Sequence, residues 1–119
     1  MAIVNATIPG NIGSTYYKNE DLGGTAVVVS ASATTLYLIR VDNSRNSSAV
    51  WFKAWNNAAP TVGTTAPDCI FKCPAGKVKT ALIPRGMAFG TACSIACLTS
   101  WGTAGTTSPP SDVTVELYY

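Results

Sequence analysis

Apolar and polar residues alternate with a period of two along much of this chain of 119 residues. In residues 34–42, TTLYLIRVD, Leu36 and Leu38 fall on one face, while Tyr37 and Ile39 fall on the other. Such alternation is typical of β-strands, and no segment has the apolar spacing of an amphipathic helix of useful length. Strands are therefore predicted at residues 25–30, 34–42, 49–55, 69–73, 77–83, 91–99 and 112–119.

Turn-forming residues separate these predicted strands. Gly, Pro, Asn, Ser and Thr cluster between them, and short strands with regularly spaced turns are typical of a β-sandwich or barrel. We predict an all-β fold, an antiparallel β-sandwich of jelly-roll or Ig-like type, over residues 23–119. Residues 1–22 lack sustained alternation and end in two glycines, which predicts an extended N-terminal arm. We expect the arm to dock, either on its own sandwich or on a neighbouring subunit, by adding a strand to an open edge.

Several connections have recognisable turn chemistry. The hydrophilic stretch NSRNSS at 43–48 predicts a hairpin between the strands on either side. PAG at 74–76 and PRG at 84–86 combine the fixed φ of proline with a glycine that is free to take a positive φ, which predicts tight turns. Two similar stretches, VGTTAPD at 62–68 and AGTTSPPSD at 104–112, are interpreted as strand-to-strand corners at the same end of the sandwich. Clustered there, they would form a neutral, Thr-rich surface for a neighbouring subunit.

The composition predicts an unusually neutral surface. Hydrophobic residues make up 47% of the chain and charged residues only 12%, against a usual charged share of about 25%. Either much of the surface is covered by partners, or the protein is a soluble domain with a neutral surface. The only local basic cluster, Lys72, Lys77 and Lys79, is too sparse for a phosphate-binding footprint, so no direct nucleic-acid binding is predicted.

Catalytic and membrane functions lack support in the sequence. The chain has no histidine, which removes Ser-His-Asp and Cys-His arrangements, and its six carboxylates are scattered. No Walker loop or dinucleotide-binding fingerprint occurs. The N-terminus lacks the features of a signal peptide, and no apolar stretch approaches the length of a membrane span. We predict a protein that is not an enzyme, needs no cofactor and does not bind membranes.

The four cysteines form two pairs within predicted strands: Cys69 with Cys73, and Cys93 with Cys97. Residues four apart on a strand share a face and lie about 13 Å apart, so one metal ion cannot bind both members of a pair without breaking the strand. No metal site is predicted. Buried, apolar thiols in the core are the simplest interpretation. Disulfides across neighbouring strands or sheets stay open as the alternative.

Aromatic side chains supply the candidate interface. If alternate residues from Val50 onward face the core, then Trp51 and Trp55 point outward and flank Lys53. Outward tryptophan pairs are typical of sugar platforms and protein interfaces. The opposite orientation of the strand, which would bury both tryptophans, stays open. The candidate interface residues are Tyr16, Tyr17, Trp51, Lys53, Trp55 and Trp101.

Three stretches carry a resemblance that covers roughly residues 34–119: YLIRVDNSRNSSAVWFKAW, TVGTTAPD and CPAGKVKTALIPRGMAFGTACSIACLTSWGTAGTTSPPSDVTVEL. Together they resemble the small virion structural proteins of tailed bacteriophages. In that family a hairpin with a V-D-N-S turn precedes a G-T-T-x-P loop, a P-A-G turn and a P-x-G-[LM]-A-[FI] segment. The chain departs from the family by placing cysteines where aliphatic residues are usual, and its N-terminal arm has no counterpart.

The resemblance implies a β-sandwich with a structural role in the virion. A capsid decoration (cement) protein is the first expectation. It would bind the major capsid protein on the outer capsid surface, as a trimer at three-fold or quasi-three-fold positions, and stabilise the head after synthesis in the host cytoplasm. Similar proteins sit at the neck, tail or fibre, so a component of those parts, including a receptor- or glycan-binding module, is the alternative. An unrelated carbohydrate-binding module is a third hypothesis, which the missing signal peptide disfavours.

Overall fold

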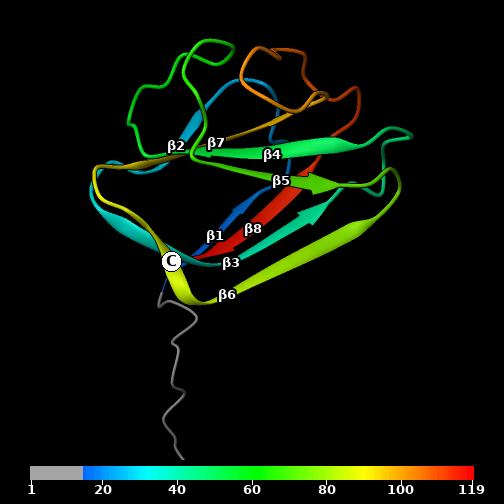
Figure 1. The fold of residues 1–119 in the computed structure, drawn as a ribbon. Helices are drawn as coiled ribbons and strands as arrows, with labels where there is room; N and C mark the ends of the chain where they lie inside the picture. The colour runs from blue at the N-terminus through cyan, green and yellow to red at the C-terminus, as the bar shows by residue number, and fades with distance from the viewer. Residues whose placement is uncertain (1–14) are drawn as a thin grey trace, which may run out of the picture.

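The computed structural model describes residues 15–119, and these residues form eight β-strands without a helix (Figure 1). The all-β prediction is confirmed. The strands are β1 (Tyr16–Asn19), β2 (Val27–Ser30), β3 (Thr34–Asp42), β4 (Val50–Trp55), β5 (Cys69–Cys73), β6 (Val78–Phe89), β7 (Cys93–Leu98) and β8 (Thr114–Tyr118).

The strands form two antiparallel sheets that pack face to face. The lower sheet in Figure 1 has the order β1-β8-β3-β6, and the upper sheet has the order β2-β7-β4-β5. The first strand thus pairs with the last, the second with the seventh, the third with the sixth and the fourth with the fifth. This pattern is that of one long hairpin rolled into two layers, the jelly roll. The order differs from that of Ig domains, so the structure decides between the two predicted types of sandwich.

The connection at 43–48 crosses from one sheet to the other, because β3 lies in the lower sheet and β4 in the upper one. The predicted hairpin is therefore wrong. Two buried asparagines hold this corner: Asn43 Nδ2 donates to the carbonyl oxygens of Ser48 at 2.9 Å and Pro74 at 3.1 Å. Asn46 Nδ2 donates to Asn43 Oδ1 at 2.9 Å. These side-chain amides bond backbone carbonyl oxygens of the corner and of the neighbouring turn at Pro74.

The PAG segment forms the predicted tight turn, whereas PRG does not. The Lys77 N–H donates to the Pro74 carbonyl oxygen at 3.3 Å, and Gly76 has a φ of 68°. By contrast, β6 runs through residues 84–86 without reversing. Its register with β3 jumps from the pair Leu38–Leu82 to the pair Leu36–Met87, so residues 83–86 form a bulge opposite Tyr37.

Gly86 permits this bulge, at which β6 bends sharply in Figure 1. Its φ is 76°, and a Cβ atom there would lie 2.3 Å from Thr35 Cγ2. The glycine therefore lets β6 bend where two side chains of β3 approach its backbone. The predicted turn at 84–86 is wrong because a proline and a glycine favour a bulge as readily as a reversal.

The sandwich begins before residue 23, where the sequence placed its boundary. β1 pairs with β8, and Thr15 and Tyr119 exchange two backbone hydrogen bonds of 2.9 Å. Leu22 is buried in the core, and its N–H donates to the Val113 carbonyl oxygen at 3.0 Å. Residues 16–19 thus add a strand to the edge of their own sheet. Residues 1–14 of the predicted arm lie outside the described residues.

The core lies between the sheets and includes three of the four cysteines. Cys73, Cys93 and Cys97 are fully buried, and Cys69 packs against the same cluster; all four are free thiols. β4 separates β5 from β7, so cysteines on those two strands are two strand spacings, or about 9–10 Å, apart. A disulfide needs Cα atoms within about 7 Å. The structure therefore supports core thiols over disulfides.

We expect the thiols to be shielded in the folded protein. Burial raises the pKa of Cys93 and Cys97 to about 12, so little reactive thiolate forms near neutral pH. Ellman's reagent should modify the half-buried Cys69 first, although burial and then Asp68 raise its pKa too, while Cys73 and the other two react at the rate of unfolding. In denaturant without reductant, all four should react. Fewer than four reactive thiols after denaturation would show that disulfides form.

Candidate interaction surfaces

The outer face of β4 is covered, although the orientation of the strand is as predicted. Val50 and the alternate residues after it face the core, and Trp51, Lys53 and Trp55 lie on the opposite face. Lys53 is nevertheless 0% exposed and Trp55 only 1% exposed. Their prediction as surface contacts is wrong, because two long connections fold back over this face. We call these connections, residues 56–68 and 99–113, the loop layer; Figure 1 shows both above β4.

Side chains from the upper sheet hold the loop layer in place through hydrogen bonds to its backbone. Lys53 Nζ donates to the Gly102 carbonyl oxygen at 2.5 Å, and Trp55 Nε1 donates to the Thr65 carbonyl oxygen at 2.9 Å. On β7, Ser94 Oγ donates to the Asn57 carbonyl oxygen at 2.6 Å. Without these bonds the polar atoms would be buried without a partner, which costs about 1–3 kcal/mol for each atom.

Lys53 is the most costly of these anchors. Its burial removes water from the ammonium group and lowers its pKa. A lysine at this position is unexpected in a core, but its aliphatic stem packs like an apolar residue while its tip reaches the loop. Sequence reasoning placed Lys53 on the outer face correctly and failed to see that two loops would cover it.

The two halves of the loop layer start from opposite ends of the sandwich. β4 and β7 are antiparallel neighbours, with Trp55 beside Ser94 and Trp51 beside Leu98, so the strands end at opposite sides. The prediction that both GTT stretches turn at the same end is wrong. They still meet over β4, where a Cβ atom on Gly63 would lie 2.5 Å from Thr106 Cγ2.

The outer surface of the loop layer is neutral. Residues 56–67 and 99–111 contain no charged residue. Thr64, Thr106 and Thr107 are exposed, and Trp101 is 72% exposed. A large, exposed indole on an uncharged surface is typical of an interaction site. Among the candidate residues from the sequence, Trp101 is the one that this surface displays.

The remaining candidate residues lie elsewhere. Trp51 is half-buried, and Lys72 Nζ lies 5.6 Å from its ring centroid, within the range of a cation–π contact. Tyr17 packs against the core cluster. Tyr16 is 48% exposed on the lower sheet, on the far side of the sandwich from the loop layer. The candidate residues therefore do not form one interface.

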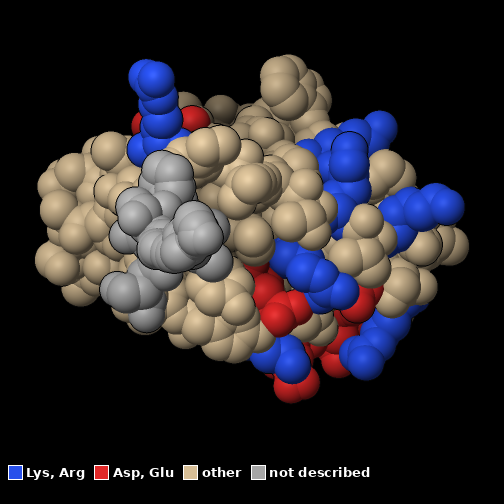
Figure 2. Space-filling model, turned by 90° about the horizontal axis from the view of Figure 1, so that it is seen from below, with Lys and Arg blue, Asp and Glu red and all other residues tan. Residues whose placement is uncertain are grey.

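The outer face of the lower sheet has two rows of side chains that run across all four strands. The apolar row consists of Tyr16, Tyr118, Leu38 and Leu82, which are register partners from β1 to β6. The polar row beside it consists of Lys18, Glu116, Arg40 and Thr80. Figure 2 shows this face, with most of its charged residues gathered toward one end. The sequence did not reveal these rows, because their members are far apart in the chain.

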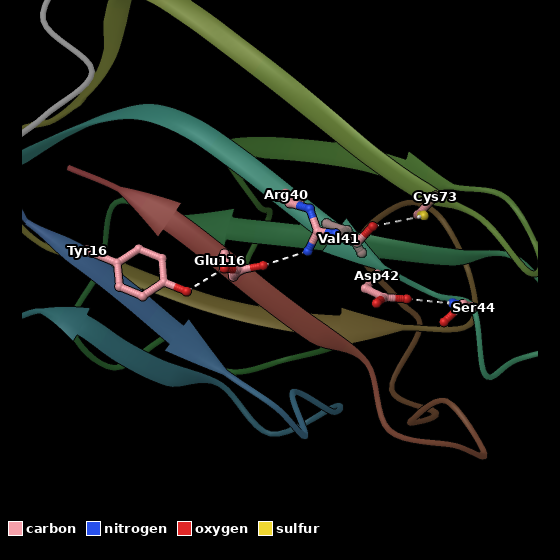
Figure 3. A network of polar contacts seen from close by, with 7 residues as sticks. All are labelled: Tyr16, Arg40, Val41, Asp42, Ser44, Cys73 and Glu116. Atoms are coloured by element: carbon pink, nitrogen blue, oxygen red, sulfur yellow. Dashed lines mark hydrogen bonds and ion pairs between the residues drawn. The ribbon is translucent and has the colours of Figure 1, made fainter.

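Glu116 of β8 connects Tyr16 of the apolar row with Arg40 of the polar row. Tyr16 Oη donates to Glu116, and Arg40 Nη1 lies 2.6 Å from Glu116 Oε1 (Figure 3). The hydrogen bond from Tyr16, and then the Arg40 guanidinium, hold the pKa of Glu116 below its usual range. The same hydrogen bond raises the pKa of Tyr16 to about 12. This network links β1 to β8 and β3 through charge as well as backbone pairing.

We expect Glu116 to make stability depend on acid. Because its pKa is lower in the folded state, its contribution is present above the unfolded pKa and is lost as pH falls through the folded pKa. At neutral pH, Glu116→Gln should cost about 0.5–1 kcal/mol. The variant should also lose less stability than the parent in urea titrations between about pH 5 and pH 3. The exposed Glu20→Gln is the control, and equal acid sensitivity of Glu116→Gln and the parent would contradict this role.

We expect the contact between Gly63 and Thr106, which joins the two halves of the loop layer, to contribute to stability. Gly63 has a φ of 91° and Gly76 a φ of 68°, but a Cβ atom on Gly76 meets nothing within 4 Å. Alanine at either position incurs a backbone cost of about 1–2 kcal/mol. Gly63→Ala should cost more than Gly76→Ala in chemical unfolding, because it also pushes Thr106 away. Equal costs would show that the contact contributes nothing.

Comparisons with known families, proteins and structures found no match. No family model matches the chain, and no curated protein or solved structure is significantly similar to it. Within residues 15–119 there is no pocket and no group of three or more metal-ligating side chains. None of the described residues belongs to a helix long and apolar enough to cross a membrane.

Proposed function

We propose that this chain is a non-enzymatic virion structural protein, a capsid decoration protein that binds the outer surface of a phage head and stabilises it. The observation that carries the proposal is the loop layer, which is uncharged over residues 56–67 and 99–111 and on which Trp101 is 72% exposed. Tryptophan is enriched among the residues that dominate protein interfaces. Jelly rolls recur in viral capsid proteins and in lectins, which agrees with a structural or binding role. The sequence resemblance to phage virion proteins supports the capsid.

The loop layer suits this role because it is already ordered. Lys53 and Trp55 hold its backbone against the upper sheet, so little conformational entropy is lost when a partner binds. The partner is the major capsid protein, and a neutral surface favours apolar and hydrogen-bonding contacts over ion pairs. Many copies, each bridging adjacent shell subunits, would oppose the outward pressure of the packaged genome. The resemblance also implies a trimer, an expectation that the oligomeric state of the purified chain tests.

The exposed Trp101 also supports a second candidate, a tail, neck or fibre component that binds host glycans. Indole rings stack on sugar rings, and lectins include jelly rolls. The number of copies per particle separates the two candidates. A decoration protein is present in a fixed, near-stoichiometric ratio to the major capsid protein, whereas a tail or neck component is far rarer.

We expect Trp101→Ala to weaken binding to shells that lack this protein by about tenfold or more. Thr106→Lys should weaken it too, because it places a charge on the neutral loop layer. Co-sedimentation of purified protein with the shells measures both. Lys18→Ala on the lower sheet is the matched control and should bind as the parent does.

Unchanged binding by Trp101→Ala and Thr106→Lys would show that the loop layer does not contact the shell. A loss confined to Lys18→Ala would move the contact to the lower sheet. Binding to glycans on an array, lost in Trp101→Ala, would favour the second candidate over the first.

A further inference from the structure

The free edge of β6 has a hydrogen-bonding pattern that its bonds to β3 determine. β6 is the last strand of the lower sheet, and no strand of the described residues lies beyond it (Figure 1). The Asn43 N–H donates to the Lys77 carbonyl oxygen at 2.8 Å, directly beyond the register pair of Asp42 with Val78. Antiparallel pairs alternate between those that exchange hydrogen bonds and those that do not. Asp42 and Val78 therefore form a pair that does not.

Because the pairs alternate, every second residue of β6 from Val78 to Leu82 forms no hydrogen bond with β3. Val78, Thr80 and Leu82 direct their N–H and C=O groups away from β3, toward the open edge. The opposite edge of the sheet leads to the same assignment. Thr15 and Tyr119 exchange hydrogen bonds there, and the alternation carried across β8 and β3 again turns Val78 outward. Three consecutive outward positions thus present unpaired donors and acceptors within the described structure.

The side chains at these positions leave the edge accessible. Val78 is 43% exposed, Leu82 is 58% exposed, and Thr80 is exposed between them. None of the three is charged, although the exposed Lys79 lies between them on the other face of the strand. The other three edge strands are shorter: β1 and β2 have four residues each, and β5 has five, including the exposed Lys72. β6 is therefore the edge best suited to receive another strand.

We propose that the occupant of this edge is a second copy of the chain, with the two β6 strands antiparallel about a two-fold axis at Thr80. Val78 of one copy then faces Leu82 of the other, and the two Thr80 side chains face each other. Cross-strand apolar pairs and Thr–Thr pairs both stabilise sheets. On the inner side, Lys79 faces Ala81 of the other copy, so no like charges are opposed. The two Lys79 side chains are then diagonal neighbours rather than direct partners, and the uncharged outward residues pair with themselves.

The two neighbouring registers of a β6–β6 pair would be less stable. A two-fold axis at Lys79 would place the two lysines directly opposite each other, which destabilises the pair. An axis at Ala81 would place Val78 opposite Pro84, which has no N–H to donate. The axis at Thr80 is the register that pairs all three outward residues of both copies.

In this dimer the two-fold axis fixes where the two loop layers lie. A two-fold axis that relates antiparallel strands of one sheet stands perpendicular to that sheet. Both loop layers would therefore lie on the same side of the dimer, so one partner surface could bind both, with a gain in avidity. The inference does not rest on the proposed function, because the purified chain alone is enough to test it.

The experiment uses opposite charges at the two-fold axis. Thr80→Lys and Thr80→Glu each place like charges face to face in a dimer of identical copies. Sedimentation equilibrium over a concentration series should show a dimer for the parent and an association at least about tenfold weaker for each variant alone. An equimolar mixture of the two variants should dimerise again, because lysine then faces glutamate.

Two further variants separate pairing from general surface effects. Val78→Lys lies at the proposed contact, and Val28→Lys lies on β2, with 43% and 44% exposure of the native side chains. Both should keep the circular dichroism spectrum of the parent, but only Val78→Lys should weaken the dimer. A parent that stays monomeric to its solubility limit, or forms a trimer, overturns the proposal. So does a dimer that resists Thr80→Lys, or a mixture that fails to recover.

Discussion

The register of β8 is the constraint on which the rest of the structure depends. β8 lies between β1 and β3 in the lower sheet, so the first strand and the third are joined only through the last one. Its alternation sends Val115 and Leu117 into the core and leaves Glu116 on the outer face, within reach of Tyr16 and Arg40. A slip of one residue would exchange these faces and bury the carboxylate. The rows on the lower sheet and the free groups at the edge of β6 follow from the same register.

The loop layer has a different physical basis. It is long and rich in Gly, Ser, Thr and Pro, and its order comes from side chains beneath it rather than from strands of its own. At Lys53 two effects oppose each other. Burial disfavours its charged form, whereas its hydrogen bond to the Gly102 carbonyl oxygen satisfies the loop backbone. Such an arrangement keeps polar anchors inside and leaves a neutral outer surface for contact. The same anchors remove Lys53 and Trp55 from any interface.

The two candidate surfaces are independent of each other. The loop layer covers the upper sheet, and the β6 edge belongs to the lower one. A protein that binds a shell through one surface and its own copy through the other has two weak contacts that reinforce each other. Low overall charge, which the composition already indicated, suits both contacts, because neither relies on ion pairs.

The sequence by itself indicated seven of the eight strands, with β6 only in part and β1 missed, because a period of two is a local property of the chain. It favoured core thiols and an outward Trp51, but it left disulfides and the opposite orientation of β4 open. It also located Trp101 outside the strands. Only the tertiary structure decided that residues 43–48 cross between sheets, that PRG is a bulge, and that Lys53 and Trp55 lie beneath loops. Most pairings join strands that are not consecutive, so neither the topology nor the cover over an outward face can be read from local alternation. The side on which a residue points was encoded locally, whereas what lies on that side depended on segments distant in the chain.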